Sequence, residues 1–105
     1  MRKIKKTFET QEEMNTDSFE TLTKTLKSLK RILKKLKGLV SEEMWQLYDN
    51  AQALWEIYIS AEYKILEKEY EGGSILPLMI NVRHNDLAKV RIKYFKEVIK
   101  RIGSV

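Results

Sequence analysis

Apolar residues recur at alternating intervals of three and four positions through most of this 105-residue chain. Such spacing is typical of a helix with one buried face, because 3.6 residues make one turn. In residues 19–37 the repeat is unbroken, and the residues that carry it are Phe19, Leu22, Leu26, Leu29, Leu33 and Leu36. The pattern predicts a helix whose leucine-rich face packs against other helices.

Residues 42–71 carry two such repeats side by side. The first, which we call the Met44 row, consists of Met44, Leu47, Ala51, Leu54, Tyr58, Ala61 and Ile65. The second, the Trp45 row, consists of Trp45, Tyr48, Gln52, Trp55, Ile59, Glu62 and Leu66. Two rows on one helix indicate contact with two neighbours, so we expect this helix to be the central one.

A third apolar face lies in residues 86–102, where it includes Ala88, Ile92 and Phe95. Glycine follows each of the three segments, as it commonly does at the carboxyl ends of helices. Each segment also has a polar residue that can cap its amino end: Asp17 or Ser18, then Ser41, then Asn85 or Asp86.

These signals predict a single all-α domain over residues 1–105, an antiparallel three-helix bundle with a long central helix. The main helices are expected at residues 19–37, 42–71 and 86–102. Residues 1–18 are expected to add a short fourth helix at the amino terminus, and Pro77 suits the first turn of a short helical piece in the linker. The short connection before Ser41 favours antiparallel neighbours.

Charge is distributed unevenly along the chain. Residues 19–38 contain seven basic residues and one acidic residue, residues 39–71 contain two and eight, and residues 72–105 contain seven and two. The basic residues of the outer helices recur at helical spacing and form two ridges. The ridge residues are Lys24, Lys27, Lys30, Arg31 and Lys34, and then Lys89, Lys93, Lys96 and Lys100.

Two interpretations of these ridges stay open. In one, the cations form surface pairs with the acidic middle helix, each contributing about 0–1 kcal/mol. In the other, they follow the phosphate backbone of DNA or RNA. Lysine outnumbers arginine on the ridges, and lysine suits backbone attraction better than base recognition. The second interpretation therefore predicts binding with little sequence specificity.

The composition indicates in which cellular compartment the protein works and argues against a secreted or membrane-spanning protein. No cysteine is present, which excludes disulfides and thiolate metal sites and favours a reducing, cytoplasmic compartment. The basic start MRKIKK is followed by polar residues, unlike a signal peptide, and no apolar run is long enough to span a membrane. Abundant Lys, Glu and Ile lean toward a thermophilic source. The lysine–leucine stretch at residues 27–39 is expected to pack in the core rather than bind lipid.

Catalytic motifs are missing from the sequence. His84 is the single histidine, and it is expected to be a loop or cap residue that hydrogen-bonds locally. Glu62 falls within the Trp45 row and is expected at an edge, paired with a lysine. No phosphate loop, catalytic triad or zinc spacing occurs, so we expect no enzyme activity, no cofactor and no metal. Tyr63 and Tyr70 lie off both rows and are candidates for contact with another protein.

The sequence therefore predicts a small non-enzymatic helical protein that binds nucleic-acid backbone, as an accessory subunit of a larger nucleoprotein complex. The alternative is a helical interaction module or adaptor subunit that makes no direct nucleic-acid contact. A homodimer is compatible with both, because helices of unequal length leave apolar surface uncovered.

Overall fold

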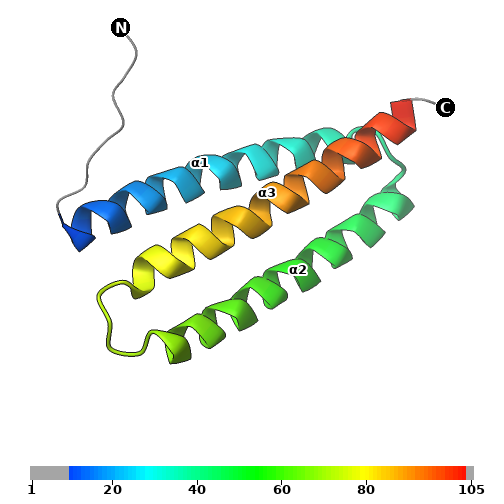
Figure 1. Ribbon diagram of the computed structural model, residues 1–105. Coiled ribbons are helices and arrows are strands. Elements are labelled where there is room, and N and C mark those ends of the chain that lie inside the picture. Colours follow the sequence, from blue (N-terminus) through cyan, green and yellow to red (C-terminus); the bar gives the residue numbers. More distant parts are fainter. Residues whose placement is uncertain (1–9, 104–105) are drawn as a thin grey trace, which may run out of the picture.

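Three long helices make up the described part of the chain. The computed structural model describes residues 10–103 and contains α1 (Gln11–Lys37), α2 (Glu42–Glu69) and α3 (Leu76–Gly103). No strand occurs in this range. Figure 1 shows α1 and α3 running in the same direction, with α2 running in the opposite direction. The all-α fold with three main helices is confirmed.

Helix α1 begins eight residues before the predicted start, at Gln11. Thr10 caps it: the Thr10 hydroxyl accepts a hydrogen bond from the Glu13 N–H at 3.0 Å, and the Glu13 carboxylate accepts one from the Thr10 N–H at 3.2 Å. This reciprocal capping box satisfies two amide groups that have no partner inside the helix. Residues 11–18 are thus the first turns of α1, and the separate amino-terminal helix is wrong for residues 10–18. Residues 1–9 lie outside the described range.

Helix α3 begins at Leu76, ten residues before the predicted start. Pro77 lies in its first turn, where the missing N–H is not needed. Asn85 lies inside the helix and is buried, so it is no cap. Polar residues concealed the helical pattern here, because the inward-facing positions Asn81, His84 and Asn85 interrupt the apolar spacing.

Helix α2 agrees more closely with its prediction. Ser41 is its N-cap, as expected, and the Ser41 hydroxyl accepts a hydrogen bond from the Met44 N–H at 3.1 Å. The helix ends at Glu69, and the turn that follows contains Gly72 with a φ of 77°. Glycine adopts this left-handed conformation without the steric penalty of a Cβ atom.

The core lies mainly between α1 and α3, which pack against each other along their lengths. Its centre consists of Leu29, Leu36, Phe95 and Val98, none more than 4% exposed. At the amino-terminal end of the same contact, the Asn81 side-chain amide donates to the hydroxyl of Ser18 at 3.0 Å. In the repeat of α1, Leu22, Leu29 and Leu36 are therefore buried as the spacing predicted, Leu26 and Leu33 are half-buried, and Phe19 at its start is 59% exposed.

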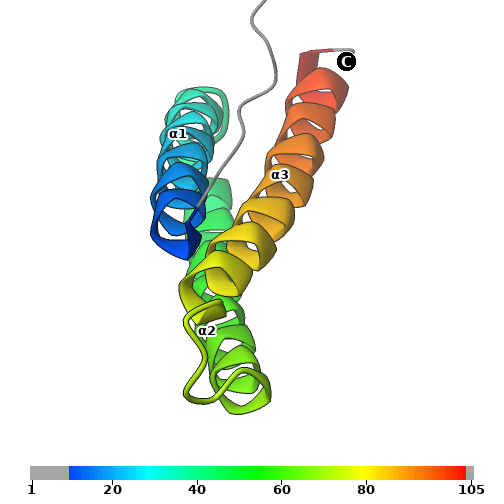
Figure 2. The same ribbon diagram turned by 60° about the vertical axis from the view of Figure 1, so that its left-hand side comes forward.

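Helix α2 is peripheral, so the prediction that it is the central helix is wrong. It packs mainly through the Trp45 row, in which Gln52, Ile59 and Leu66 are buried. Figures 1 and 2 show α1 and α2 diverging from the loop that joins them, and the carboxyl-terminal end of α2 lies far from α1. The heptad spacing identified which residues share a face, but spacing alone does not decide which face is covered.

Candidate functional site

All nine cations of the two predicted ridges are exposed. The main apolar stripes of α1 and α3 pack against each other in the core, which leaves the basic residues of these two helices on their outer sides. An exposed ammonium or guanidinium group can meet an anion without disturbing the core. The predicted ridges are therefore available to a ligand from solvent.

A groove of about 260 Å³ lies along the amino-terminal half of the α1–α3 contact, with Asp17 on one wall and Val82 on the other. Residues seven and fourteen positions further along a helix return to nearly the same side. The same sides of both helices therefore continue, toward the carboxyl ends, with basic residues. These residues are Lys24 and Arg31 on α1, and Lys89 and Lys96, with Lys93 and Lys100 beside them, on α3.

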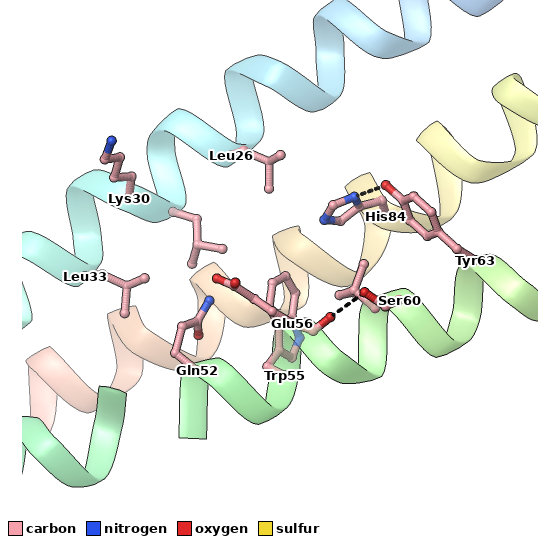
Figure 3. A pocket seen from close by; sticks show the side chains of 11 residues that line it. Leu26, Lys30, Leu33, Gln52, Trp55, Glu56, Ser60, Tyr63 and His84 are labelled. Atoms are coloured by element: carbon pink, nitrogen blue, oxygen red, sulfur yellow. Dashed lines mark hydrogen bonds between the residues drawn. The ribbon is translucent and has the colours of Figure 1, made fainter. Parts of the chain in front are cut away.

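The other cations of α1 turn away from α3. Lys27, Lys30, Arg31 and Lys34 together line a shallow hollow on the outer surface of α1. Lys30 also lies at the rim of a pocket between α1 and α2 (Figure 3). The ridge on α1 is thus broader than a single line, and Arg31 belongs to both of its parts.

The acidic helix α2 does not neutralise these cations in the described range. Glu62 forms its ion pair with Arg83, at 2.8 Å, and Glu71 forms one with Lys68, at 3.5 Å. Neither pair involves a ridge residue, and no glutamate of residues 42–69 is ion-paired with a basic residue of α1. The divergence of α1 and α2 explains this, because it separates their side chains. Glu62 is half-buried and ion-paired, as expected of an edge residue, but its partner is Arg83, so the expected lysine partner is wrong.

A pocket of about 530 Å³ opens between α1 and α2. Figure 3 shows leucines of α1 on one side and Trp55 of α2 on the other, with His84 of α3 at one end. Polar groups line it too, and these are Lys30, Gln52, Glu56, Ser60, Tyr63 and His84. The pocket is a consequence of the divergence of the two helices, and the sequence pattern gave no sign of it.

His84 and Tyr63 join α3 to α2 at the end of this pocket. The Tyr63 hydroxyl lies 2.7 Å from Nδ1 of His84, and their rings meet edge to face. Burial lowers the pKa of His84, although Glu56 nearby opposes this shift, and burial raises the pKa of Tyr63. The lowered pKa favours the neutral imidazole, and the tautomer of His84 decides whether Nδ1 accepts from the Tyr63 hydroxyl or donates to it. His84 is neither a loop residue nor a cap, which corrects the prediction.

Arg91 is a second link that the sequence did not indicate. Its guanidinium lies over the Phe95 ring at 4.7 Å and near the rings of Tyr94 and Trp55, and its Nε donates to the Gln52 side chain at 3.0 Å. Burial lowers the pKa of Arg91. The one sequence signal for this contact was Gln52, a polar residue between the aromatic residues of the Trp45 row, which indicated that a buried polar group needs a partner.

The two tyrosines proposed for protein contact lie in different surroundings. Tyr63 is half-buried against His84, and Tyr70 is half-buried at the carboxyl end of α2, where its N–H donates to the Leu66 carbonyl at 2.9 Å. Tyr63 therefore has a role within the chain. Contact of either residue with another protein stays a prediction.

The described residues contain no group of three or more acidic, histidine or cysteine side chains suited to a metal ion. None of the three helices has the length and apolar character that crossing a bilayer requires.

No protein-family model matches this chain, and neither a curated protein nor a solved structure matches it.

Proposed function

We propose that this protein binds the phosphate backbone of DNA or RNA with little sequence specificity, as a non-enzymatic subunit of a nucleoprotein complex. The observation that carries the proposal is the exposure of all nine ridge cations, together with the parallel packing of the two helices that bear them. Because the helices are adjacent, Lys24 and Arg31 of α1 and Lys89 and Lys96 of α3 continue the two walls of one groove, where a phosphate backbone can reach cations of both helices.

Charge separation within the fold also supports the proposal. The acidic residues of α2 form no ion pair with the cations of α1 in the described range, so α2 gives the lysines that repel one another along that helix no compensation. An external polyanion would provide it. Release of condensed counterions from the nucleic acid adds a further favourable contribution.

The ridge chemistry indicates how such a ligand is recognised. Eight of the nine cations are lysines, which attract phosphate as point charges, and Arg31 is the one arginine. Base recognition in the major groove relies mainly on bidentate arginine, asparagine or glutamine contacts. Association is therefore governed by backbone charge, and sequence has little influence.

Salt dependence is the direct test. Fluorescence anisotropy with a labelled duplex and a labelled single strand, between about 50 and 300 mM salt, is expected to give a steep linear fall of log affinity with log salt concentration. The variant Lys89→Gln/Lys93→Gln removes two phosphate contacts and should reduce the slope by about 2. The matched control is Lys68→Gln/Arg101→Gln, which removes the same charge from exposed sites away from the groove.

Binding that is absent at low salt with both ligands, or that is insensitive to salt, contradicts the proposal. Equal losses for the two double variants also contradict it, because net charge rather than the ridges would then govern association.

A protein-interaction module is the second candidate, and the exposed Met44 row favours it. On this view the Lys89→Gln/Lys93→Gln variant leaves any nucleic-acid retention unchanged and weakens instead the capture of an acidic protein partner.

A further inference from the structure

The outer side of α2 carries a continuous apolar strip. Every member of the Met44 row is exposed: Met44 42%, Leu47 59%, Leu54 66%, Tyr58 45% and Ile65 52%, together with Ala51 and Ala61. Ile57, next to the row, is 65% exposed. The row extends along about 30 Å of helix. Contiguous apolar surface of this kind marks an interaction site, whereas isolated exposed side chains do not.

The strip has the spacing of a coiled-coil seam. Its intervals of 3, 4, 3, 4, 3 and 4 keep all seven residues on one side of the helix for three heptads. On α1 the leucines at this spacing are buried or half-buried within the chain, and on α2 the described part of the chain offers nothing to cover the strip. Another helix of matching periodicity is the partner that fits this geometry.

We infer that two copies of this protein associate through the Met44 rows of their α2 helices, paired antiparallel. In an antiparallel pair, alternate seam positions of the two helices meet in layers. One register gives three kinds of layer, each occurring twice by symmetry: two kinds place a large residue against alanine, and the third places leucine against tyrosine, while Ile65 lies beyond the last layer. The layers are Met44 with the partner's Ala61, Leu47 with the partner's Tyr58, and Ala51 with the partner's Leu54.

Charge beside the seam fits the same register. Glu43 precedes the first seam residue and Lys64 precedes the last, and both side chains are exposed. The antiparallel pairing brings Glu43 of each copy to Lys64 of the other, so the attractive contact occurs twice. A parallel, in-register pair would place Lys64 opposite the partner's Glu69 and would leave Glu43 opposite an aromatic residue. Both directions give Lys64 an acidic partner, but only the antiparallel one also gives Glu43 a basic partner, so the flanking charges favour a second copy in that direction.

Most acidic residues of α2 do not oppose this association. Asp49, Glu56 and Glu67 lie on the side of the helix away from the seam, and Glu62 is paired with Arg83. The exposed parts of the seam side chains and of Ile57 would remove roughly 1,000 Å² in total from solvent, which is at the lower end of specific interfaces. A reversible dimer follows, with both basic helices of each copy outside the contact. The inference does not depend on nucleic-acid binding.

Mass in solution tests the contact directly. Sedimentation velocity at about 100 µM is expected to give twice the chain mass of 12.5 kDa, and the mass should fall to that of the monomer on dilution. Leu54→Glu places a charge in the middle of the seam and should weaken association at least about 100-fold. Leu54 is exposed within the chain, so circular dichroism should show unchanged helix content. Ala53→Glu adds the same charge on the opposite side of α2 and should leave the dimer intact.

Charge exchange tests the direction of the pair. Glu43→Lys alone and Lys64→Glu alone each place like charges opposite one another twice, and each should weaken association. Mixing the two variants should yield a heterodimer, because every such contact then joins opposite charges, and the double variant in one chain should dimerise again. The heterodimer is detected by capture of an untagged variant on its tagged counterpart.

The outcomes divide clearly. A wild-type protein that remains monomeric at about 100 µM overturns the inference, as does a Leu54→Glu variant that keeps the wild-type mass. Failure of the mixed charge variants to associate overturns the antiparallel pairing. Because all of these are measurements of mass without nucleic acid, their result is independent of the salt-dependence test of the proposed function.

Discussion

Helices α1 and α2 differ by one residue in length, 27 against 28, and both carry apolar residues at heptad spacing. On α1, Leu22, Leu29 and Leu36 are at most 4% exposed, whereas on α2 the five large members of the Met44 row are 42–66% exposed. Identical periodicity thus produces a buried core in one region and an open surface in the other. An apolar helix face is buried only where another helix packs against it. Here α3 packs against α1 along most of its length, and no helix of the described range packs on the Met44 row.

The largest expected effect contrasts these two regions. Phe95→Ala opens a cavity in the α1–α3 core and should lower the free energy of unfolding by about 3–5 kcal/mol. Leu54→Ala also removes a large apolar side chain, but from the exposed Met44 row, and should lower the free energy of unfolding by about 0.5 kcal/mol or less. Urea unfolding at low micromolar concentration, where a dimer is dissociated, measures both. Comparable losses would mean that the Met44 row is covered within the monomer.

A smaller contrast lies within the α1–α3 contact, between two buried asparagines. Asn81 donates to the Ser18 hydroxyl at 3.0 Å and to the Asn15 carbonyl at 3.3 Å, so Asn81→Ala should cost about 1–3 kcal/mol. The Asn85 side-chain oxygen is buried and has no hydrogen-bond partner in the described range, so Asn85→Ala should cost less than about 1 kcal/mol. Chemical denaturation of the two variants under the same conditions measures both losses in the free energy of unfolding. A larger loss for Asn85→Ala than for Asn81→Ala would contradict this prediction.

The smallest effect concerns the attachment of α2 through His84. Because burial lowers the pKa of His84, the unfolded chain binds a proton more readily than the folded one. The contribution of this residue to stability is therefore complete above the unfolded pKa of about 6.5 and declines as the pH falls through the folded value. Unfolding curves at several pH values should show this decline for the wild type. His84→Gln should lack it, and parallel pH profiles for the two proteins would exclude His84 as its source.

The sequence predicted the elements of the fold whose signals are local. The Ser41 cap and the leucine stripe of α1 depend on neighbouring residues of one helix, and both are confirmed. The starts of α1 and α3 were wrong because Ser18 and Asn85 resemble caps in isolation. In the structure they are side chains of the α1–α3 contact, where a partner helix stabilises helical residues that local preference does not.

The candidate site shows the same division. Helical spacing alone indicated that the nine ridge cations are exposed, since residues opposite an apolar stripe face solvent. The Tyr63–His84 bond and the contact of Arg91 with Gln52 join residues that are 21 and 39 positions apart. Such pairs depend on how two helices are placed against each other, and no pattern within either helix specifies this.

The parallel direction of α1 and α3 has an electrostatic consequence at one end of the molecule. Peptide dipoles in the two helices add side by side, so their carboxyl ends bring two partial negative charges together. The last turns at that end carry Lys34, Lys35 and Lys37 on α1 and Lys100 and Arg101 on α3. These five cations offset the aligned dipoles. Part of the positive charge of this protein therefore holds two like-oriented helices together, and salt that screens it should loosen that end first.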